Sequence, residues 1–247
     1  NIDVVFETEV SSVDVYSKRV MTSKGAYDYD KLIYALGARC FIAPIQGADA
    51  PHVVSVRNIA DTEKVKSLLK PGANVVCIGG GVMGLEAAWE LKQGGCRVTV
   101  LEGAPGLLPK QLDDKASAML EGIVTSCGID VVTGAGISQI TASDVKLNDG
   151  RSFAADLVIM STGMRPNTAI AEAAGIKTEN GFICVDAHMH TSAADVYACG
   201  DCVTYDGQPQ AFWAQASETG RIAGADAAGE PLTYSPLSGS LSINAFN

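Results

Sequence analysis

The chain has 247 residues, and its 18 basic and 28 acidic residues give a formal net charge of −10. This length suits one large or two small domains, and the acidic charge disfavours nucleic acid or an anionic membrane as the main partner. The seven cysteines lie mostly in apolar runs, as small buried side chains do in a reducing compartment. No apolar run reaches the ~18–20 residues of a membrane span and no signal peptide is visible, so we expect a cytoplasmic protein.

Short β-prone runs dominate the beginning of the chain. The runs cover residues 3–6, 10–16, 19–22 and 31–35. With turn chemistry at residues 23–25, they predict a β-meander. Residues 32–35 of the last run continue into residues 36–39, and together they predict a strand that ends at a glycine. Residues 40–56 contain proline and glycine and predict a connector.

Strands and helices alternate in the middle of the chain. Asp61 is a favourable N-cap for a helix over residues 62–69, and Asp113 is one for an amphipathic helix over residues 114–126. Residues 85–91, rich in Ala, Leu and Glu, predict a further helix. Apolar runs predict strands at residues 75–78, 98–102, 129–132 and 156–160.

A second β-meander is predicted before the last of these strands. Its runs are residues 137–140, 145–147 and 152–153, with a strong hairpin turn at residues 148–150. Residues 55–163 therefore predict a closed, doubly wound α/β unit. The flanking residues form no unit of their own unless they come together, so we expect the α/β unit to be inserted into a discontinuous domain.

A glycine motif follows the strand predicted at residues 75–78. Gly79, Gly81 and Gly84 form G-x-G-x-x-G before a helix, and a second strand ends at Glu102. The first glycine allows a tight turn, the second lets the backbone approach a pyrophosphate, and the third lets helix and strand pack closely. The helix N-terminus would stabilise phosphates, and Glu102 stands near the spacing of an acid that binds a ribose 2′-hydroxyl. The alternative is a glycine-rich turn that binds nothing.

A second candidate site follows the strand predicted at residues 196–198. Gly200 and Asp201 come shortly after this strand, and Asp201 therefore places a carboxylate at its C-terminal end, where α/β sheets bind ligands. The carboxylate could accept hydrogen bonds from sugar-like hydroxyls. It could equally cap the following turn, and these residues alone leave both interpretations open.

Four motifs, in this order, resemble those of one family. They are residues 35–37 (A-L-G), 79–86 (G-x-G-x-x-G-x-E), 161–168 (S-T-G-M-R-P-N-T) and 196–201 (V-Y-A-C-G-D). Together they resemble the two-dinucleotide-binding flavoproteins of the pyridine nucleotide–disulfide oxidoreductase superfamily. Residues 56–59, 108–113 and 213–216 are similar to rubredoxin reductases and to the nitrite-reductase-type NADH-dependent flavoproteins. The resemblance covers nearly the whole chain.

This resemblance implies a doubly wound, Rossmann-like NAD-binding domain at residues 55–163. The domain would be inserted into an incomplete FAD-binding domain with β-meanders, formed by residues 1–54 and 164–247. The implied NAD-binding residues are Gly79, Gly81, Val82, Met83, Gly84, Glu102 and Gly163. The implied FAD-binding residues are Gly37, Arg39, Gly200, Asp201 and Trp213.

The resemblance also implies roles for particular side chains. Asp201 would hydrogen-bond the ribityl chain of FAD. The helix after Trp213 would point its N-terminus at the pyrimidine edge of the flavin, where reduced flavin gathers negative charge. Glu86, the candidate catalytic residue, would lie near the contact between nicotinamide and flavin. The alternatives are an ordinary core position for Trp213 and, for Glu86, a surface acid favoured by the helix dipole.

The sequence departs from the family pattern at both ends. The family opens with its own strand–G-x-G-x-x-G–helix for the FAD pyrophosphate, and that unit is not in this sequence. The sequence also stops about where the family's C-terminal interface domain would begin. We therefore expect a middle fragment with a complete NAD site, with FAD binding weakened or lost. An unpaired sheet edge would favour self-association.

The expected activity of the parent is transfer of hydride from NADH to FAD, with electrons passed on to a small redox protein such as rubredoxin. The alternatives are an isolated NAD-binding fragment without activity, or a fragment of an NADH oxidase or CoA-disulfide reductase-type enzyme. NADH is favoured over NADPH because Glu102 is followed by Gly103 and Ala104, without an arginine to receive a 2′-phosphate. A carboxylate ~4 Å from that phosphate would cost on the order of 4 kcal/mol at an effective dielectric of 20.

Cysteine and histidine pairs raise two further possibilities. Cys199 and Cys202 have C-x-x-C spacing, which suits a redox dithiol or half a zinc site. No second pair stands at zinc-finger spacing, so buried thiols are favoured. His188 and His190 share one face of a predicted strand without an evident third ligand, and we interpret them as surface polar residues. No metal is expected.

Overall fold

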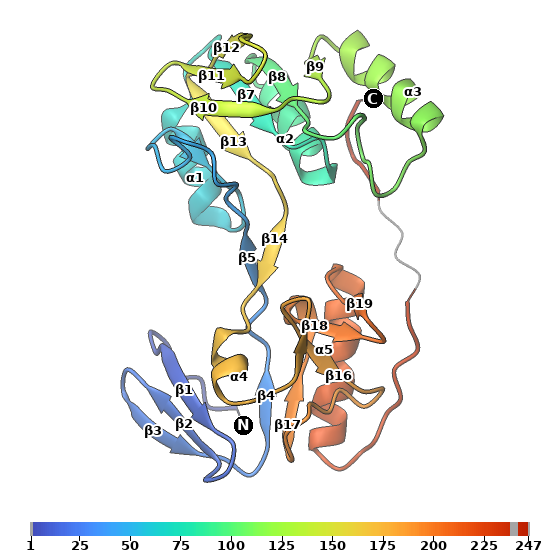
Figure 1. Cartoon of the computed structure of the whole chain (residues 1–247). Helices are drawn as coiled ribbons and strands as arrows, with labels where there is room; N and C mark the ends of the chain where they lie inside the picture. Colours follow the sequence, from blue (N-terminus) through green and yellow to red (C-terminus); the bar gives the residue numbers. More distant parts are fainter. Residues whose placement is uncertain (1, 238–241, 247) are drawn as a thin grey trace. The chain divides into compact units, whose positions relative to one another are not determined.

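The computed structural model describes residues 2–237 and 242–246. The chain divides into two compact units (Figure 1). Unit 1 comprises Asn1–Arg39 with Arg165–Ser240, and unit 2 comprises Cys40–Met164 with Leu241–Asn247.

Residues 40–54 are grouped with unit 2, whereas the sequence predicts them in the outer, discontinuous domain. The reason is local packing. Ala43, Ile45, Ala48 and Ala50 pack against a hydrophobic core of unit 2 that contains Val53 and Val76. The connector is thus a covering layer of unit 2.

A five-stranded parallel sheet forms the centre of unit 2. Its strand order is β6 (Val53–Val54), β13 (Leu157–Met160), β7 (Asn74–Ile78), β8 (Arg97–Leu101) and β9 (Asp130–Val132). Every neighbouring pair runs parallel. Sheets of this kind are covered on both faces, which explains why the strands are apolar runs rather than alternating ones. The predicted α/β class is confirmed.

Helices cover one face of this sheet. They are α1 (Ile59–Leu68), α2 (Val82–Gln93) and α3 (Asp114–Ser126). Their residues Val65, Leu85 and Val124 share one hydrophobic core with Val75 and Cys77 of β7. The intervening residues of β7 belong to a different core, as the two-residue period of a strand requires.

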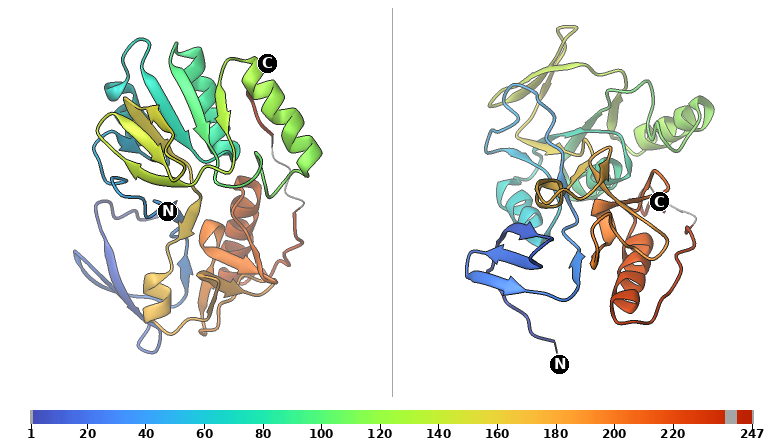
Figure 2. Two further views of the ribbon diagram at one scale, coloured as in Figure 1. Left: turned by 45° about the horizontal axis from the view of Figure 1, so that its top comes forward. Right: turned by 60° about the horizontal axis from the view of Figure 1, so that its bottom comes forward.

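A β-meander, rather than a second layer of helices, covers the other face. Its antiparallel strands are β10 (Ile137–Ile140), β11 (Asp144–Leu147) and β12 (Ser152–Ala154). Ile140 and Val145 form a core with Val76 and Ile78 of β7. The left view of Figure 2 shows the meander and the helices on either side of the sheet. The predicted hairpin turn is present, with Gly150 at a φ of +90°.

The helix caps bear out one prediction and correct another. Asp113 caps α3, because its side chain accepts a hydrogen bond from Ala116 N at 2.8 Å. The predicted N-cap of α1, Asp61, is wrong. Asn58 is the cap, and Asp61 lies in the first turn, where the two residues form a reciprocal capping box. The helix therefore begins three residues earlier than predicted, at Ile59 instead of residue 62.

Unit 1 begins with an antiparallel sheet of β1 (Val10–Asp14), β2 (Arg19–Thr22) and β3 (Gly25–Asp28). The strand predicted at residues 3–6 is wrong, because the described residues 2–6 form no strand, and Ile2 and Phe6 are largely exposed. A run of apolar residues is misleading here because nothing in the described chain covers it. The strand β3, exposed along its whole length, has no apolar signal and is not predicted.

The rest of unit 1 is built from distant segments of the chain. Strand β4 (Leu32–Tyr34) pairs in parallel with β17 (Val196–Ala198), as expected if the two flanks come together. A four-stranded sheet has the order β15 (Thr178–Glu179), β16 (Phe182–Val185), β18 (Val203–Tyr205) and β19 (Gln208–Pro209). The helices of unit 1 are α4 (Ala169–Ala173), the 3-10 helix at Gly200–Cys202 and α5 (Trp213–Ala227).

Two further segments complete the chain. Strands β5 (Ala38–Cys40) and β14 (Met164–Pro166) form a two-stranded sheet where the chain passes between the units. The C-terminal residues 242–246 pack on helix α2, with the ring of Phe246 against that of Trp89 at a centroid distance of 5.4 Å. Among the helices of the described residues, none is long and apolar enough to cross a membrane.

Candidate functional site

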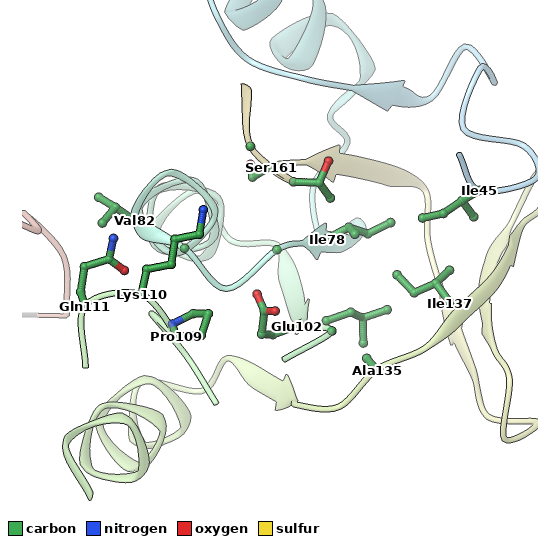
Figure 3. Close-up of a pocket in the computed structure, with 16 residues that line it drawn as sticks. Ile45, Ile78, Val82, Glu102, Pro109, Lys110, Gln111, Ala135, Ile137 and Ser161 are labelled. Atoms are coloured by element: carbon green, nitrogen blue, oxygen red, sulfur yellow. The ribbon is translucent and has the colours of Figure 1, made fainter. Parts of the chain in front are cut away.

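A pocket of about 510 Å³ lies at the carboxyl ends of three parallel strands of unit 2. Ile78 ends β7, Leu101 ends β8, and Ser161 follows β13, and all three line the pocket. The carboxyl ends of parallel strands are where open α/β sheets bind ligands. Figure 3 shows the labelled side chains around this space, with Val82 at the start of α2 and Glu102 below it.

Two glycines of the motif are required by the protein itself. Gly79 has a φ of +112°, and a Cβ there would collide with the carbonyl oxygen of Ser161. A Cβ on Gly84 would collide with the carbonyl oxygen of Gly79, because the first turn of α2 lies directly on the loop. These constraints are the tight turn and the close helix–strand packing that the sequence predicts.

Gly81 differs from both, because nothing in the protein requires a glycine there. Its φ is −80°, which any residue adopts, and no heavy atom lies within 4 Å of a Cβ built on it. Gly81 also lines the pocket. We call the glycine loop at Gly79–Gly81, together with the first turn of α2, the cradle. The open space at Gly81 fits a group that approaches the backbone closely, such as a pyrophosphate.

The beginning of α2 has the electrostatics of an anion site. Its N-cap, Gly81, provides no side-chain hydrogen bond, and the first turn contains no acidic residue. The first N–H groups of a helix have no partner within the helix, and the helix dipole places partial positive charge at this end. Backbone N–H groups and dipole together attract phosphate.

Glu102 fixes the glycine loop from the neighbouring strand end. Its Oε2 accepts a hydrogen bond from Gly80 N at 2.6 Å, and its Oε1 accepts one from Ala104 N at 2.6 Å. The side chain lines the pocket and is partly buried. Each carboxylate oxygen has lone pairs beyond the one used here, so Glu102 can also accept hydrogen bonds from the hydroxyls of a bound ribose.

The remaining residues predicted for the first site divide into two groups. Val82 and Gly163 line the pocket, and Gly163 has a φ of +109°. Met83 is 61% exposed and does not line it. Glu86 lies outside the lining as well, and its Oε1 accepts a hydrogen bond from Asn244 N at 3.3 Å.

Several pocket residues are not predicted from the sequence. They include Ile45, Pro109, Lys110, Gln111, Ala135, Ile137, Ser161 and Thr162. Ser161 and Thr162 follow a buried parallel strand, and that position could have identified them. The others come from the connector, from the loop before α3 and from the start of the meander, and only the tertiary fold brings those segments together.

In unit 1, Gly37 and Arg39 are held by one asparagine. Asn167 donates from its backbone N to Gly37 O at 2.9 Å, and its Oδ1 accepts a hydrogen bond from Arg39 at 3.1 Å. Gly37 has a φ of +59°, which favours glycine. Both residues are thus tied to the segment that directly follows β14.

The second motif of unit 1 is joined to helix α5. Gly200, with a φ of +76°, donates from its N to Thr219 Oγ1 at 3.0 Å. Asp201 lies in the 3-10 helix directly after β17 and is partly exposed. Trp213, the first residue of α5, is 86% exposed, so the alternative of an ordinary core tryptophan is wrong.

The thiol pair within this motif is not poised for redox chemistry. Cys199 and Cys202 are both buried. Burial raises the pKa of the Cys199 thiol to about 11 and raises that of Cys202 as well. Because the thiolate is the reactive form, this burial disfavours the reactive form of both cysteines at neutral pH.

The two histidines belong to a polar cluster. His190 lies between two carboxylates, with Nδ1 at 3.0 Å from Asp186 Oδ2 and Nε2 at 3.0 Å from Asp226 Oδ1. Burial alone would lower the pKa of His190, but these hydrogen bonds outweigh it and raise the pKa. His188 Nδ1 lies 3.6 Å from the same Asp226. Within residues 2–237 and 242–246, no group of His, Cys, Asp or Glu is arranged to hold a metal ion.

Comparison with known proteins places this geometry in a family. Residues 1–228 match the family model described as pyridine nucleotide-disulphide oxidoreductase. The chain is 32% identical over 212 residues to a nitric oxide reductase FlRd-NAD(+) reductase of Vibrio vulnificus (strain YJ016), covering 84% of this chain and 55% of the relative. It is 33% identical over 253 residues to an NADH oxidase of Methanocaldococcus jannaschii, covering 96% of this chain and 56% of the relative.

Solved structures agree in fold. A NAD-dependent persulfide reductase from A. fulgidus matches with a TM-score of 0.89 and 32% identity, over 92% of this chain and 45% of that one. Putidaredoxin reductase in its covalent complex with putidaredoxin matches with a TM-score of 0.90 and 27% identity, over 97% of this chain and 61% of that one. The chain spans about half the length of the curated relatives named above.

Proposed function

Since the chain belongs to the pyridine nucleotide-disulphide oxidoreductase family, we propose that the pocket of unit 2 binds NADH and that the whole protein is an FAD-dependent NADH oxidoreductase. Hydride would pass from NADH to FAD, and electrons would pass on to a small redox protein such as rubredoxin. Bound FAD would supply the redox chemistry by accepting hydride and releasing electrons. The protein's own residues bind and orient the two cofactors.

The observation that carries this proposal is the contrast among the motif glycines. The fold requires glycine at Gly79 and Gly84, whereas Gly81 lines the pocket and no protein atom would oppose a side chain there. A pyrophosphate placed against Gly81 would meet the N–H groups at the start of α2 and the positive end of its dipole. Gly79, Gly81, Val82, Met83, Gly84 and Gly163 are the proposed NAD-binding residues around this position.

Glu102 is the proposed ribose-binding residue and the source of preference for NADH. Gly80 and Ala104 hold its carboxylate at the end of β8, and its remaining lone pairs suit two ribose hydroxyls. The 2′-phosphate of NADPH would instead bring negative charge against a fixed carboxylate. Across ~4 Å at an effective dielectric of 20, this repulsion is on the order of 4 kcal/mol before screening by solvent.

We propose unit 1 as the FAD side, with Gly37, Arg39, Gly200, Asp201 and Trp213 as its binding residues. The support is that Gly200 is hydrogen-bonded to Thr219 of helix α5, so the 3-10 helix that carries Asp201 is tied to α5. The N-terminus of α5 would stabilise negative charge on a reduced flavin. Glu86 is retained as a candidate near the contact between nicotinamide and flavin.

A redox protein as electron acceptor is supported by the relatives. One relative is named for its FlRd partner, and one solved structure is a complex of a reductase with putidaredoxin. A second candidate is an NADH oxidase, because a relative of that name matches almost the whole of this chain. Self-association is also proposed, since β4 pairs only with β17 among the described strands and its other edge can accept a further strand.

Three measurements test these proposals. Calorimetric titration of the 247-residue chain with NADH and NADPH tests the pocket, and equal affinity would refute the assignment of Glu102. The visible spectrum of the purified chain tests FAD, for which a stoichiometric band near 450 nm (roughly, for flavin cofactors of this kind) is the positive result. NADH-dependent reduction of rubredoxin, measured beside oxygen consumption, separates the two acceptors.

A further inference from the structure

We propose that Lys110 is a phosphate-binding residue, which holds the pyrophosphate of the dinucleotide over the first turn of α2. This inference rests on the proposed function of the same pocket and adds a residue that the glycine motif does not contain. Among the described residues that line the pocket, Lys110 is the one cation, and Glu102 is the one carboxylate.

The side chain of Lys110 is well placed for this role. It extends from its turn toward the beginning of α2, beside Val82 (Figure 3). Glu102 directly follows β8, and its carboxylate accepts a hydrogen bond from Gly80 N in the glycine loop, before the start of α2. A dinucleotide with its ribose on Glu102 and its phosphates against Gly81 would therefore bring the phosphates, rather than the adenosine ribose, next to Lys110.

The turn that carries Lys110 is tied to the glycine loop itself. Leu108 N donates to Gly80 O at 3.0 Å, and Gln111 N donates to Leu108 O at 2.9 Å. Gly80 N donates to Glu102, so both backbone groups of Gly80 are used to fix its surroundings. The buried Leu107 packs against Gly80, where a Cβ would stand 2.6 Å from Leu107 Cδ2. The base of Lys110 is thus fixed with respect to the cradle.

Backbone strain at Leu108 is consistent with a turn held in place for function. This buried leucine has a φ of +50°, in the left-handed region that leucine rarely adopts. Such residues persist only where surrounding contacts determine the conformation, and they cluster at ligand sites. Here the consequence is that Pro109 and Lys110 are directed back over the pocket, which they line.

Charge balance explains why a lysine is needed there. A pyrophosphate diester carries two negative charges, and the pocket already contains the carboxylate of Glu102. The structure gives Lys110 no ion pair or hydrogen bond within the described residues, so its ammonium group is available. Its exposed four-carbon stem can bring that group to a phosphate as a point charge.

The test is calorimetric titration of the full chain and of three variants with NADH, ADP-ribose, adenosine and NADPH. Lys110→Gln should lower the affinity for NADH and ADP-ribose by about tenfold, the scale of one charge-assisted hydrogen bond. Its affinity for adenosine should equal that of the wild type. Lys110→Arg should retain most of the affinity. Lys115→Gln, an exposed lysine on α3 that does not line the pocket, removes the same charge and should change nothing.

The outcomes separate this inference from the proposed function. If the wild-type chain binds neither NADH nor ADP-ribose, the proposed function fails and the inference fails with it. If the wild type binds both and Lys110→Gln binds them equally well, the inference alone is overturned. A loss confined to NADPH would assign Lys110 to a 2′-phosphate and would also overturn it. Unfolding curves of the variants exclude a general loss of structure.

Discussion

The two candidate sites differ in how much of the protein each one needs. The glycine loop of unit 2 lies in one continuous strand–loop–helix–strand segment, whereas the rest of its pocket comes from the connector, the loop before α3, the meander and the end of β13. The motif in unit 1 depends on strand β17 pairing with β4, more than 160 residues earlier in the chain. The glycine loop is therefore specified by neighbouring residues, whereas the unit 1 motif, like the rest of the pocket lining, depends on segments that only the fold brings together.

The glycines of the two units also differ in whether the fold itself requires a glycine at each position. In unit 2, the fold requires glycine at Gly79 and Gly84, whereas no protein atom opposes a Cβ at Gly81, the proposed phosphate-binding position. In unit 1, Gly37 and Gly200 both have positive φ values and both form hydrogen bonds, so a structural need already accounts for them. Glycine is therefore a sharper functional signal at Gly81 than at either position of unit 1.

The largest expected effect is on folding of unit 2. Gly84→Ala would force a methyl group against the carbonyl oxygen of Gly79, and overpacking of this kind costs about 3 kcal/mol or more. Denaturant unfolding should show this loss, together with loss of NADH binding. The matched control is Gly122→Ala, because Gly122 is an exposed residue of α3 and an added Cβ there would meet no atom within 4 Å. The free energy of unfolding of this control variant should rise by up to about 1 kcal/mol.

Gly81→Ala should give the opposite pattern, with binding lost and folding kept. The added methyl group meets no protein atom, so the free energy of unfolding should change by at most about 1 kcal/mol, the scale of an N-cap substitution. Because the methyl group occupies the space of the pyrophosphate, NADH affinity should fall by about tenfold or more. Unchanged affinity would mean that the cradle does not receive phosphate.

A change of cofactor preference is expected from Glu102→Gln. Neutralising this carboxylate removes its repulsion of a 2′-phosphate, and the ratio of NADH to NADPH affinity should fall by about tenfold, since solvent screens part of the interaction. Calorimetry with both cofactors measures the ratio. Glu90→Gln, on the exposed side of α2, makes the same change in net charge outside the pocket and should leave the ratio as it is.

The same contrast explains what could be predicted from sequence. The parallel strands, the meander and the glycine loop of unit 2 follow from apolar runs and local turn chemistry, and the structure confirms them. Ile45 and Ile137 could not be predicted as pocket residues, because the connector and the meander reach the pocket only through tertiary packing. The N-cap of α1 is misassigned from sequence because Asn58 and Asp61 are both good caps, and the reciprocal hydrogen bonds alone identify Asn58.

The smallest expected effect concerns pH and unit 1. Hydrogen bonds to Asp186 and Asp226 raise the pKa of His190 above its ordinary value of 6.5. A raised pKa in the folded state means that protonated His190 stabilises the fold. This contribution is fully present below pH 6.5 and is lost as the pH rises through the folded-state value. His190 is 43% exposed, so the contribution should be at most about 1 kcal/mol.

His190→Gln tests this contribution directly. The variant should be less stable than the wild type at about pH 5.5–6, and the difference should shrink as the pH rises to about 8.5, because there the wild-type histidine is neutral too. Urea unfolding at several pH values gives the comparison. His52→Gln is the matched control, since that histidine belongs to unit 2 and lies outside the cluster. If the two proteins differ in stability by the same amount at every pH, His190 stabilises unit 1 by packing and its charge contributes nothing.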